Sequence, residues 1–279
     1  MGQAEKFDAK YWVKVRNSTK GESVFLTWSG GIYALIPGEP KVHLFNMVGM
    51  NVSRSVDKGD GSWDFASREL TYYLDPKTDE ILHRWKNPWS GEVLPVVHVS
   101  NNPVQGRFKG DFPATVEGDF TTFAFDLFSH YENPLAGDER FADYSPNPIY
   151  QAVELFKLTV PTADLHNPEI ASVSPLILAW DRIGPWVPWM KMGDRTGQLI
   201  YSGLGHKVAR FEDLPPVLKN EINTQVPIYR EAPVERIEGE SITSWRYFQQ
   251  HFEAYLAGDR FPIAEMGFQT NRKSPDSGL

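Results

Sequence analysis

The chain has 279 residues, no cysteine and a formal net charge of -8. The absence of cysteine excludes disulfides, thiolate metal ligation, iron–sulfur ligation and a cysteine nucleophile. The negative charge, together with the lack of any long Lys/Arg cluster, argues against nucleic acid as a partner.

Two further global features bear on domain organisation and location. The length suits one large β domain or two small ones. Because no linker interrupts the chain, we expect one domain over residues 1–279, with residues 1–20 and 269–279 as peripheral or disordered tails. No segment approaches the roughly 18 apolar residues that cross a membrane, and the N-terminus lacks the apolar run of a signal peptide. We therefore expect no membrane partner and a cytoplasmic location.

The N-terminal segment predicts a short helix followed by a hairpin. Residues 1–22 are polar apart from Tyr11-Trp12-Val13, which indicates the start of a helix. Apolar runs then stand on either side of Ser29-Gly30-Gly31 within Ser23–Ile36. Two apolar runs separated by glycines are typical of a β-hairpin, so we expect a Gly-Gly turn at this point.

Lys41–Arg54 predicts a long strand in which alternate residues, beginning at Val42, form an apolar face. Asn46 and Arg54 lie in the same phase, and a polar group on an apolar face is either paired within the core or part of a site. The polar segment Asp57–Asp64 follows. Its acidic spacing has some likeness to a calcium loop but lacks the closing glutamate of the EF-hand pattern, which favours a solvated hairpin tip.

Glu69–Val99 has the clearest pattern of the chain, three strands joined by two tight turns. Asp75–Asp79 and Asn87–Gly91 form the turns, because Pro presets φ, Asp and Asn accept backbone hydrogen bonds and Gly takes a left-handed position. We expect this meander to be the centre of a large antiparallel sheet and to end at Asn101-Asn102-Pro103. Its last strand is apolar on both faces, which predicts that His98 is internal. A buried His is either a hydrogen-bonded core residue or a catalyst.

The middle of the chain alternates long loops with strands. Residues 104–119 and 132–148 are rich in Gly, Pro and polar residues and predict two long loops, which in compact domains are often lids over a site. Thr121–Tyr131 and Ile149–Val160 have the period-two alternation of strands. Glu154 lies in an apolar phase, where burial would raise its pKa into the range of a general acid or base; the alternative is an ion pair with a neighbouring Arg.

The rest of the chain predicts two strands, an irregular aromatic segment and two helices. The strands are Ser172–Arg182 and Leu199–Val208. Between them, Ile183–Gly193 carries Pro-Trp steps that no regular element accommodates, so it either plugs one end of a barrel or walls a pocket. Asp213–Thr224 begins with an N-cap Asp and Pro, and a helix from Ser241 to Gly258 presents aromatic residues on one face.

These elements predict a mainly β fold, a single antiparallel β-barrel or strongly bent, calycin-like sheet with a few peripheral helices. The seven His are all more than four residues apart and form no local metal-binding motif. No G-x-S-x-G elbow, dinucleotide fingerprint or Walker loop occurs. We therefore expect a protein that uses no metal, nucleotide or other cofactor.

Six motifs are spread along nearly the whole chain. They are Pro37–Glu39, Gly49–Arg54, Tyr73–Thr78, Trp85–Glu92, Val96–Val99 and Trp186–Gly193. This set resembles the domain-of-unknown-function family 1838. The resemblance implies kinship with cofactor-independent lyases of bacterial lignin-dimer catabolism, which release formaldehyde from an aryl-propane side chain. It supplies no catalytic residues that can be carried over.

The first functional hypothesis is a cofactor-independent acid–base lyase or isomerase that acts on a hydrophobic, aromatic small molecule. A proton would be taken by His98 or Glu154, and Arg54, Tyr73 or Lys191 would stabilise an oxyanion or protonate the leaving group. The candidate substrate-binding residues are Trp28, Phe45, Asn46, Asn51, Trp180, Trp189 and Met190.

The second hypothesis is a carrier or sensor that binds the same kind of ligand without reacting. Aromatic residues make up 13% of the chain and include nine Trp, enough to line a pocket as well as fill a core. Two titratable groups in one cavity would favour the enzyme, whereas a dry apolar cavity would favour the carrier. A structural or partner-binding role is third, and a homo-oligomer is compatible with all three.

Overall fold

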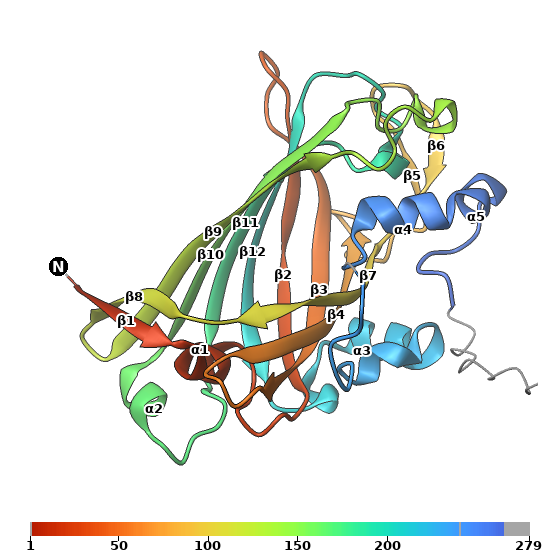
Figure 1. Cartoon of the computed structure of the whole chain (residues 1–279). Coiled ribbons are helices and arrows are strands. Elements are labelled where there is room, and N and C mark those ends of the chain that lie inside the picture. The colour runs from red at the N-terminus through yellow and green to blue at the C-terminus, as the bar shows by residue number, and fades with distance from the viewer. Residues whose placement is uncertain (1, 240, 265–279) are drawn as a thin grey trace, which may run out of the picture.

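The computed structural model describes residues 2–239 and 241–264, and its main feature is an antiparallel sheet that curls into a half-barrel (Figure 1). The sheet has ten strands in the order β1-β8-β9-β10-β11-β12-β2-β3-β4-β7. In that order they are β1 (Gln3–Asp8), β8 (Asp111–Glu117), β9 (Phe120–Glu132), β10 (Ile149–Pro161), β11 (Ile177–Gly184), β12 (Gln198–Val208), β2 (Val24–Leu35), β3 (Val42–Asp57), β4 (Trp63–Leu74) and β7 (Val99–Phe108). The predicted mainly β, strongly bent sheet with peripheral helices is confirmed.

Strand β2 passes through the two glycines that predicted a turn. A Cβ atom on Gly30 would lie only 2.0 Å from the carbonyl oxygen of Ser202, so β2 and β12 approach each other here more closely than a side chain permits. The strand is continuous and carries an irregularity between Ile32 and Tyr33. The predicted hairpin is therefore wrong, because the glycines allow a close backbone approach rather than a chain reversal.

The Glu69–Val99 meander does not form the centre of the sheet. β4 lies next to the edge strand β7, and β5 (Arg84–Lys86) pairs with β6 (Val93–Pro95) in a separate two-stranded sheet. Both predicted turns are present, and the side chains of Asp75 and Asn87 accept the expected backbone hydrogen bonds. The turn chemistry is local and was predictable, whereas the place of each strand depends on partners distant in sequence.

Most of residues 101–119 lie in strands, whereas the sequence predicts that the meander ends at 101–103 and that a long loop follows. The cis Asn102–Pro103 peptide bond lies inside β7, which pairs with β4, and β8 pairs with β1 and β9. Because Pro has no N–H to donate, it is tolerated on an edge strand such as β7. The predicted strands at 121–131, 149–160 and 199–208 and the connection at 132–148 are confirmed, the last with a short 3-10 helix, η1 (Glu139–Phe141).

Helix α1 (Ala9–Arg16) fills one end of the half-barrel. Its Trp12 is 5% exposed and stacks on Phe112, with 5.1 Å between ring centroids. β1 pairs with β8 along its whole length. Residues 3–16 thus form the edge strand β1 and helix α1, a peripheral part of the fold, while the predicted tail at 269–279 lies outside the described residues.

The irregular aromatic segment fills the opposite end. Trp189 and Met190 are buried in the 3-10 helix η2 (Pro188–Met190), among aromatic residues of the sheet and of the late helices. Of this segment, Val187 lines a cavity of about 220 Å³, and Val187, Pro188 and Trp189 border a small pocket of about 10 Å³. Of the two alternatives for this segment, a plug and a pocket wall, the structure shows mainly the plug.

Helix α3 (Pro216–Thr224) covers the convex face of β3. Val48, Met50 and Val52 pack there in one buried cluster with Leu218. The apolar face that the sequence predicts for β3 is present, but it packs against a helix on the convex side of the sheet. The opposite phase faces the concave side, where side chains of β2, β4 and β12 meet it.

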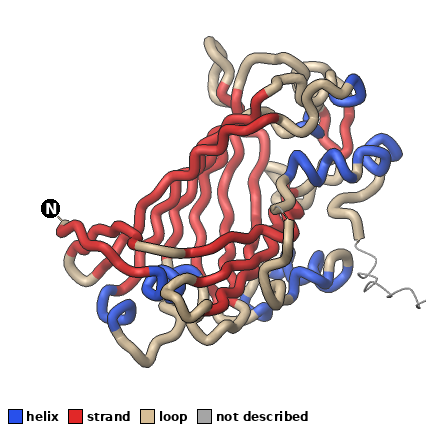
Figure 2. Tube along the Cα trace, in the orientation of Figure 1, coloured by secondary structure: helices blue, strands red, loops and turns tan. Residues whose placement is uncertain are grey.

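The late helical segment lies beside the edge strand β7 (Figure 2). The predicted helix from 241 to 258 is two helices, α4 (Ser244–Gln250) and α5 (Phe252–Ala257), and its expected aromatic face is buried. The other short elements are α2 (Thr162–His166), η3 (Phe211–Asp213) and η4 (Pro227–Arg230). Within residues 2–239 and 241–264, no helix combines the length and apolarity needed to cross a bilayer.

Candidate functional site

Two neighbouring cavities lie on the concave side of the sheet, between the α1 end and the η2 end. One has a volume of about 220 Å³ and a polar lining, and the other a volume of about 340 Å³ and a mostly aromatic lining. We call them the polar cavity and the aromatic cavity. Glu69, Glu154 and Trp180 line both, so these three residues form their common boundary.

Cross-strand pairs place the polar side chains. Glu154 of β10 lies opposite Arg182 of β11, which lies opposite Tyr201 of β12. Further along the same sheet, Asn51 of β3 lies opposite Glu69 of β4. Directly opposed residues point to the same face, so each set enters the concave side as a group. β10 and β4 are five strands apart in the sheet, and its curl brings both sets to the same cavities.

The polar cavity is built around Arg182 and three tyrosines. Arg182 Nη2 donates to the Tyr150 hydroxyl at 2.9 Å, and the guanidinium lies over the Tyr201 ring at 5.0 Å. The hydroxyls of Tyr73 and Tyr201 are 3.2 Å apart and share a hydrogen bond. The arrangement presents a buried cation and several hydroxyl groups to whatever occupies the cavity.

Burial and mutual repulsion set the protonation of the site. Burial, reinforced by the charge of Glu154, raises the pKa of Glu69 to about 7, against the hydrogen bond from Asn101 and the charges of nearby arginines. Burial also raises the pKa of Tyr73 well above its ordinary value, so this hydroxyl keeps its proton near neutral pH. Glu69 therefore holds a proton that is exchangeable near neutrality, which is the property of a general acid or base.

The aromatic cavity is walled by rings from α1 and from six strands. Phe125 and Phe156 stack with 4.9 Å between centroids, and Trp12 meets Phe125 edge-on at 5.3 Å. Further walls come from Phe65, Phe108, Leu26, Leu158 and Leu178. An apolar cavity of this size suits an aromatic ring with its substituents.

Trp28 lies in a slot between two glycines. A Cβ on Gly49 would lie 2.4 Å from Trp28 Nε1, and a Cβ on Gly205 would lie 3.2 Å from Trp28 Cβ. The two glycines occupy the cross-strand positions on either side of Trp28. Only residues without a side chain leave space for the indole against the sheet, where it lines the aromatic cavity.

Five of the residues predicted from sequence line these cavities. Glu154 and Trp180 lie on the boundary, where Trp180 Nε1 donates to Glu154 Oε2 at 2.9 Å. Tyr73 lines the polar cavity, and Trp28 and Asn51 line the aromatic one. Glu154 is half-buried and lines both cavities, and Arg182 lies opposite it in the strand pair, but the described residues show no ion pair between the two.

His98 does not share a cavity with Glu154. It is 1% exposed, and its Nδ1 accepts a hydrogen bond from the backbone N–H of Tyr73 at 3.1 Å. Burial, followed by the neighbouring His83, lowers the pKa of His98 to about 3, so the ring stays neutral. His98 lines neither of these two cavities; it borders, with Tyr73 and Trp189, a pocket of about 10 Å³, and its hydrogen bond with the backbone of Tyr73 is that of a core residue.

The other predicted residues are also placed away from the cavities. Phe45, Trp189 and Met190 pack in the buried cluster behind the polar cavity. Asn46 donates to Asp79 at 2.6 Å on the surface. The last two, Arg54 and Lys191, are paired with Ser23 and Glu92 respectively, on the convex face and on the outer side of the η2 plug. Arg54 and Asn46 are outside because their phase of β3 faces away from the concave side.

Sequence reasoning missed the residues that complete the site. They are Glu69, Arg182, Tyr150, Tyr201 and Arg16. A usable signal existed for Glu69, which alternates in phase with Thr71 and Tyr73, and for Arg182, which ends a predicted strand. Neither signal indicates the facing partner, because the pairing of β10 with β11 and of β3 with β4 is not visible in one sequence.

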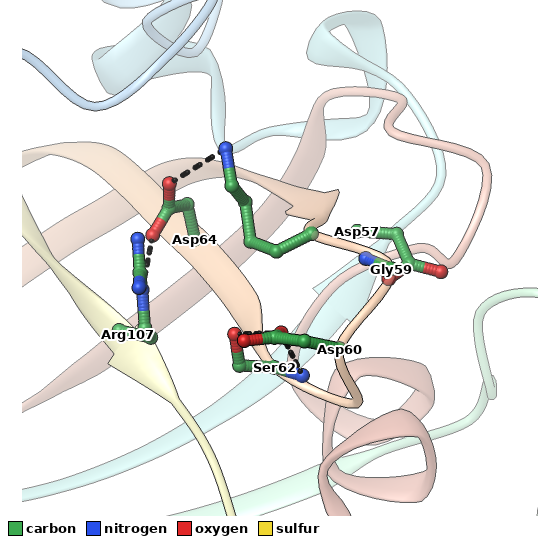
Figure 3. Close-up of polar contacts among 7 residues, drawn as sticks. Asp57, Gly59, Asp60, Ser62, Asp64 and Arg107 are labelled. Carbon is green, nitrogen blue, oxygen red and sulfur yellow. Dashed lines mark hydrogen bonds and ion pairs between the residues drawn. The ribbon is translucent and has the colours of Figure 1, made fainter.

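The acidic Asp57–Asp64 loop is a hairpin tip between β3 and β4 (Figure 3). Asp60 accepts hydrogen bonds from Ser62, and Asp64 is held by Arg107 at 2.8 Å and by Lys58 at 3.5 Å. The carboxylates are therefore engaged by separate partners. Among the described residues no group of three or more His, Asp or Glu is placed to hold a metal ion.

The fold and the cavities together define a class: a curled antiparallel β-sheet protein with an internal, ring-lined site that contains two carboxylates. A family model described as "Protein of unknown function (DUF1838)" matches residues 21–252, and the chain belongs to this family. The resemblance carried by the six motifs is thereby confirmed. A comparison with curated proteins finds no match.

Proposed function

We propose that the protein is a cofactor-independent acid–base lyase acting on an aromatic small molecule, with the polar and aromatic cavities as its site. The observation that carries the proposal is the pair Glu69 and Glu154, which borders both cavities. A carboxyl group with a pKa of about 7 beside a second carboxyl group provides an acid and a base in one place.

The roles follow from the surroundings of each group. Glu154 accepts a proton from a substrate hydroxyl, and its position is held by the Trp180 indole. Glu69, protonated through the range below about pH 7, donates to the leaving oxygen. The Arg182 guanidinium and the Tyr73 hydroxyl stabilise negative charge that develops on oxygen in the polar cavity.

The substrate class that fits is an aryl-propane diol dimer, and the reaction balances without a cofactor. Glu154 removes the proton of the terminal hydroxyl, and the carbon–oxygen double bond of formaldehyde forms as the bond between the terminal and middle carbons breaks. That electron pair forms a carbon–carbon double bond and expels the benzylic hydroxyl, which leaves as water with the proton from Glu69. The products are a diaryl alkene, formaldehyde and water, and proton return from Glu154 to Glu69 restores the site.

The test is turnover of an aryl-propane diol dimer by protein treated with a chelator, with formaldehyde and alkene measured together. We expect equal amounts of the two products, and a loss of about 10²–10⁴-fold in kcat for Glu154→Gln and for Glu69→Gln. Glu132→Gln, an exposed site on β9, is the matched control and should keep the full rate. Full rate in both cavity variants would contradict the assigned roles.

A second candidate function is a carrier for the same class of ligand, and the aromatic cavity favours it. A ring-lined cavity of about 340 Å³ can bind a ligand without any proton transfer. Saturable binding of the diol with no product over many hours, unchanged by Glu154→Gln, would establish the carrier and reject the lyase.

A further inference from the structure

Arg16 stands out among the residues that line the aromatic cavity. It is the last residue of α1, and its guanidinium lies over the Phe65 ring at 5.7 Å. Its neighbours in the cavity wall are rings and aliphatic side chains, apart from Asn51, Glu69 and Glu154. A guanidinium is costly to place in such surroundings unless an anion accompanies it.

The observed partners of Arg16 are neutral. Nη2 donates to Asn51 Oδ1 at 2.9 Å, and Nη1 to Ser53 Oγ at 3.4 Å. Within residues 2–239 and 241–264, Arg16 has no ion pair with a carboxylate. Burial lowers the pKa of Arg16 to about 10, and the more distant charge of Glu69 offsets this effect only in part.

The guanidinium is also held in place before any ligand arrives. Ser53 Oγ donates to Asn17 Oδ1 at 2.5 Å while it accepts from Arg16, and Asn17 Nδ2 donates to Ser55. Hydrogen bonds from β3 thus fix the direction of the guanidinium. A preorganised cation binds an anion with little loss of side-chain freedom.

The charges that face the cavities favour one anion. Arg16 and Arg182 contribute two positive charges, and Glu69 and Glu154 contribute one negative charge while Glu69 keeps its proton. The site then has one net positive charge. A ligand with a single negative charge at the Arg16 end would balance it.

We infer that the aromatic cavity binds a ring bearing an oxyanion, a carboxylate or a phenolate, with that oxygen on the guanidinium of Arg16 in place of one of its neutral partners. The inference deepens the proposed function, because it names the group that orients the substrate ring in the same site. It rests on that proposal only in taking the cavity as a ligand site. Neutral rings of the same size should bind more weakly because they leave the net positive charge of the site unbalanced and make no charge-assisted hydrogen bond with Arg16.

The experiment measures binding of matched naphthalene probes by tryptophan fluorescence and calorimetry, without turnover. The probes are naphthoate, the neutral isostere naphthamide, naphthol, and its methyl ether. We expect wild-type protein to bind naphthoate about 10- to 100-fold more tightly than naphthamide, the range for a hydrogen-bonded charge. If the oxyanion is a phenolate, naphthol will bind more tightly than its methyl ether by a similar factor. This preference will increase with pH as the naphthol ionises.

Three variants test the assignment to Arg16. Arg16→Gln removes the charge, and Asn51→Asp places a carboxylate beside the guanidinium; each should reduce the preference for the anionic probe to near unity. Arg107→Gln changes the net charge of the protein by the same amount at an exposed ion pair outside the cavities, and should leave the preference intact. Asn51→Asp differs from wild type by one atom type, so it keeps the test decisive if Arg16→Gln does not fold.

Two results would overturn the inference. One is equal binding of naphthoate and naphthamide by wild-type protein. The other is a preference that survives in Asn51→Asp or in Arg16→Gln. The failure of the proposed lyase can be distinguished from the failure of this inference. Arg16-dependent anion binding without any product supports the inference and rejects the enzyme. Turnover that does not depend on Arg16 supports the enzyme and rejects the inference.

Discussion

Replacing Glu69 with Gln should change how the stability of the protein depends on pH. Gln has the shape of the protonated carboxyl group but cannot ionise. Burial, reinforced by Glu154, raises the pKa of Glu69 from 4.5 to about 7 in the folded protein. In the unfolded chain the group titrates near its ordinary value, so unfolding between these two pH values releases a proton.

The sign and size follow from this difference. Stabilisation from the protonated group is complete below pH 4.5, falls as the pH rises through the interval, and is lost above about pH 7. At about 1.4 kcal/mol per pKa unit, the rise from 4.5 to about 7 corresponds to a loss of about 3–4 kcal/mol, an upper value because water reaches part of the carboxyl. The free energy of unfolding of Glu69→Gln, relative to that of wild type, should therefore increase by this amount between acid and neutral pH.

His98 makes the difference between the two proteins more informative than either curve alone. The pKa of His98 is lowered from 6.5 to about 3, chiefly by burial. Its contribution has the opposite sign, because stability is complete above pH 6.5 and is lost as the pH falls toward 3. Both proteins contain His98, so its effect cancels when the free energies of unfolding are subtracted.

The assay is urea unfolding followed by tryptophan fluorescence at a series of pH values, for wild type, Glu69→Gln and Glu154→Gln. In Glu154→Gln, the loss of stability caused by ionisation of Glu69 should be smaller than in wild type but still present. Burial contributes more than the charge of Glu154 to the raised pKa of Glu69. Parallel pH curves for wild type and Glu69→Gln would refute the raised pKa and, with it, the acid that the proposed reaction needs.

Three further predictions concern packing and placement. Gly49→Ala should destabilise the protein by about 1–3 kcal/mol in urea unfolding, because its Cβ meets the Trp28 indole, whereas Gly106→Ala, with no atom within 4 Å of the new Cβ, should change it by less than about 1 kcal/mol. Trp12→Ala should cost about 3–5 kcal/mol by the same measurement, since it empties the α1 end of the half-barrel. Lys191→Ala should leave ligand affinity and any turnover unchanged within twofold, as its ammonium pairs with a surface carboxylate; a large loss would return it to the site.

Part of the candidate site could be read from sequence because it depends on one strand. Along β10 the alternation from Tyr150 to Leu158 places Glu154 among apolar residues, and this phase is the one that faces the cavities. For β3 the same reasoning assigned Asn46 and Arg54 to the site, although their face points away from the cavities. Both of its phases are buried, and the choice between them depends on α3, which covers the phase of Met50 and leaves that of Asn51 to the cavity.

By itself the sequence determined the local elements: the long alternating strands, the Asp75 and Asn87 turns and the mainly β class. These depend on contacts between residues close in the chain, such as a side chain that accepts hydrogen bonds two or three residues on. Only the tertiary structure decided that Glu69 and Glu154 line the same cavities, since they lie five strands apart and are brought there by the curl of the sheet. The physical reason is that curvature, strand order and the face turned inward are set by long-range pairing, which local residue patterns do not encode.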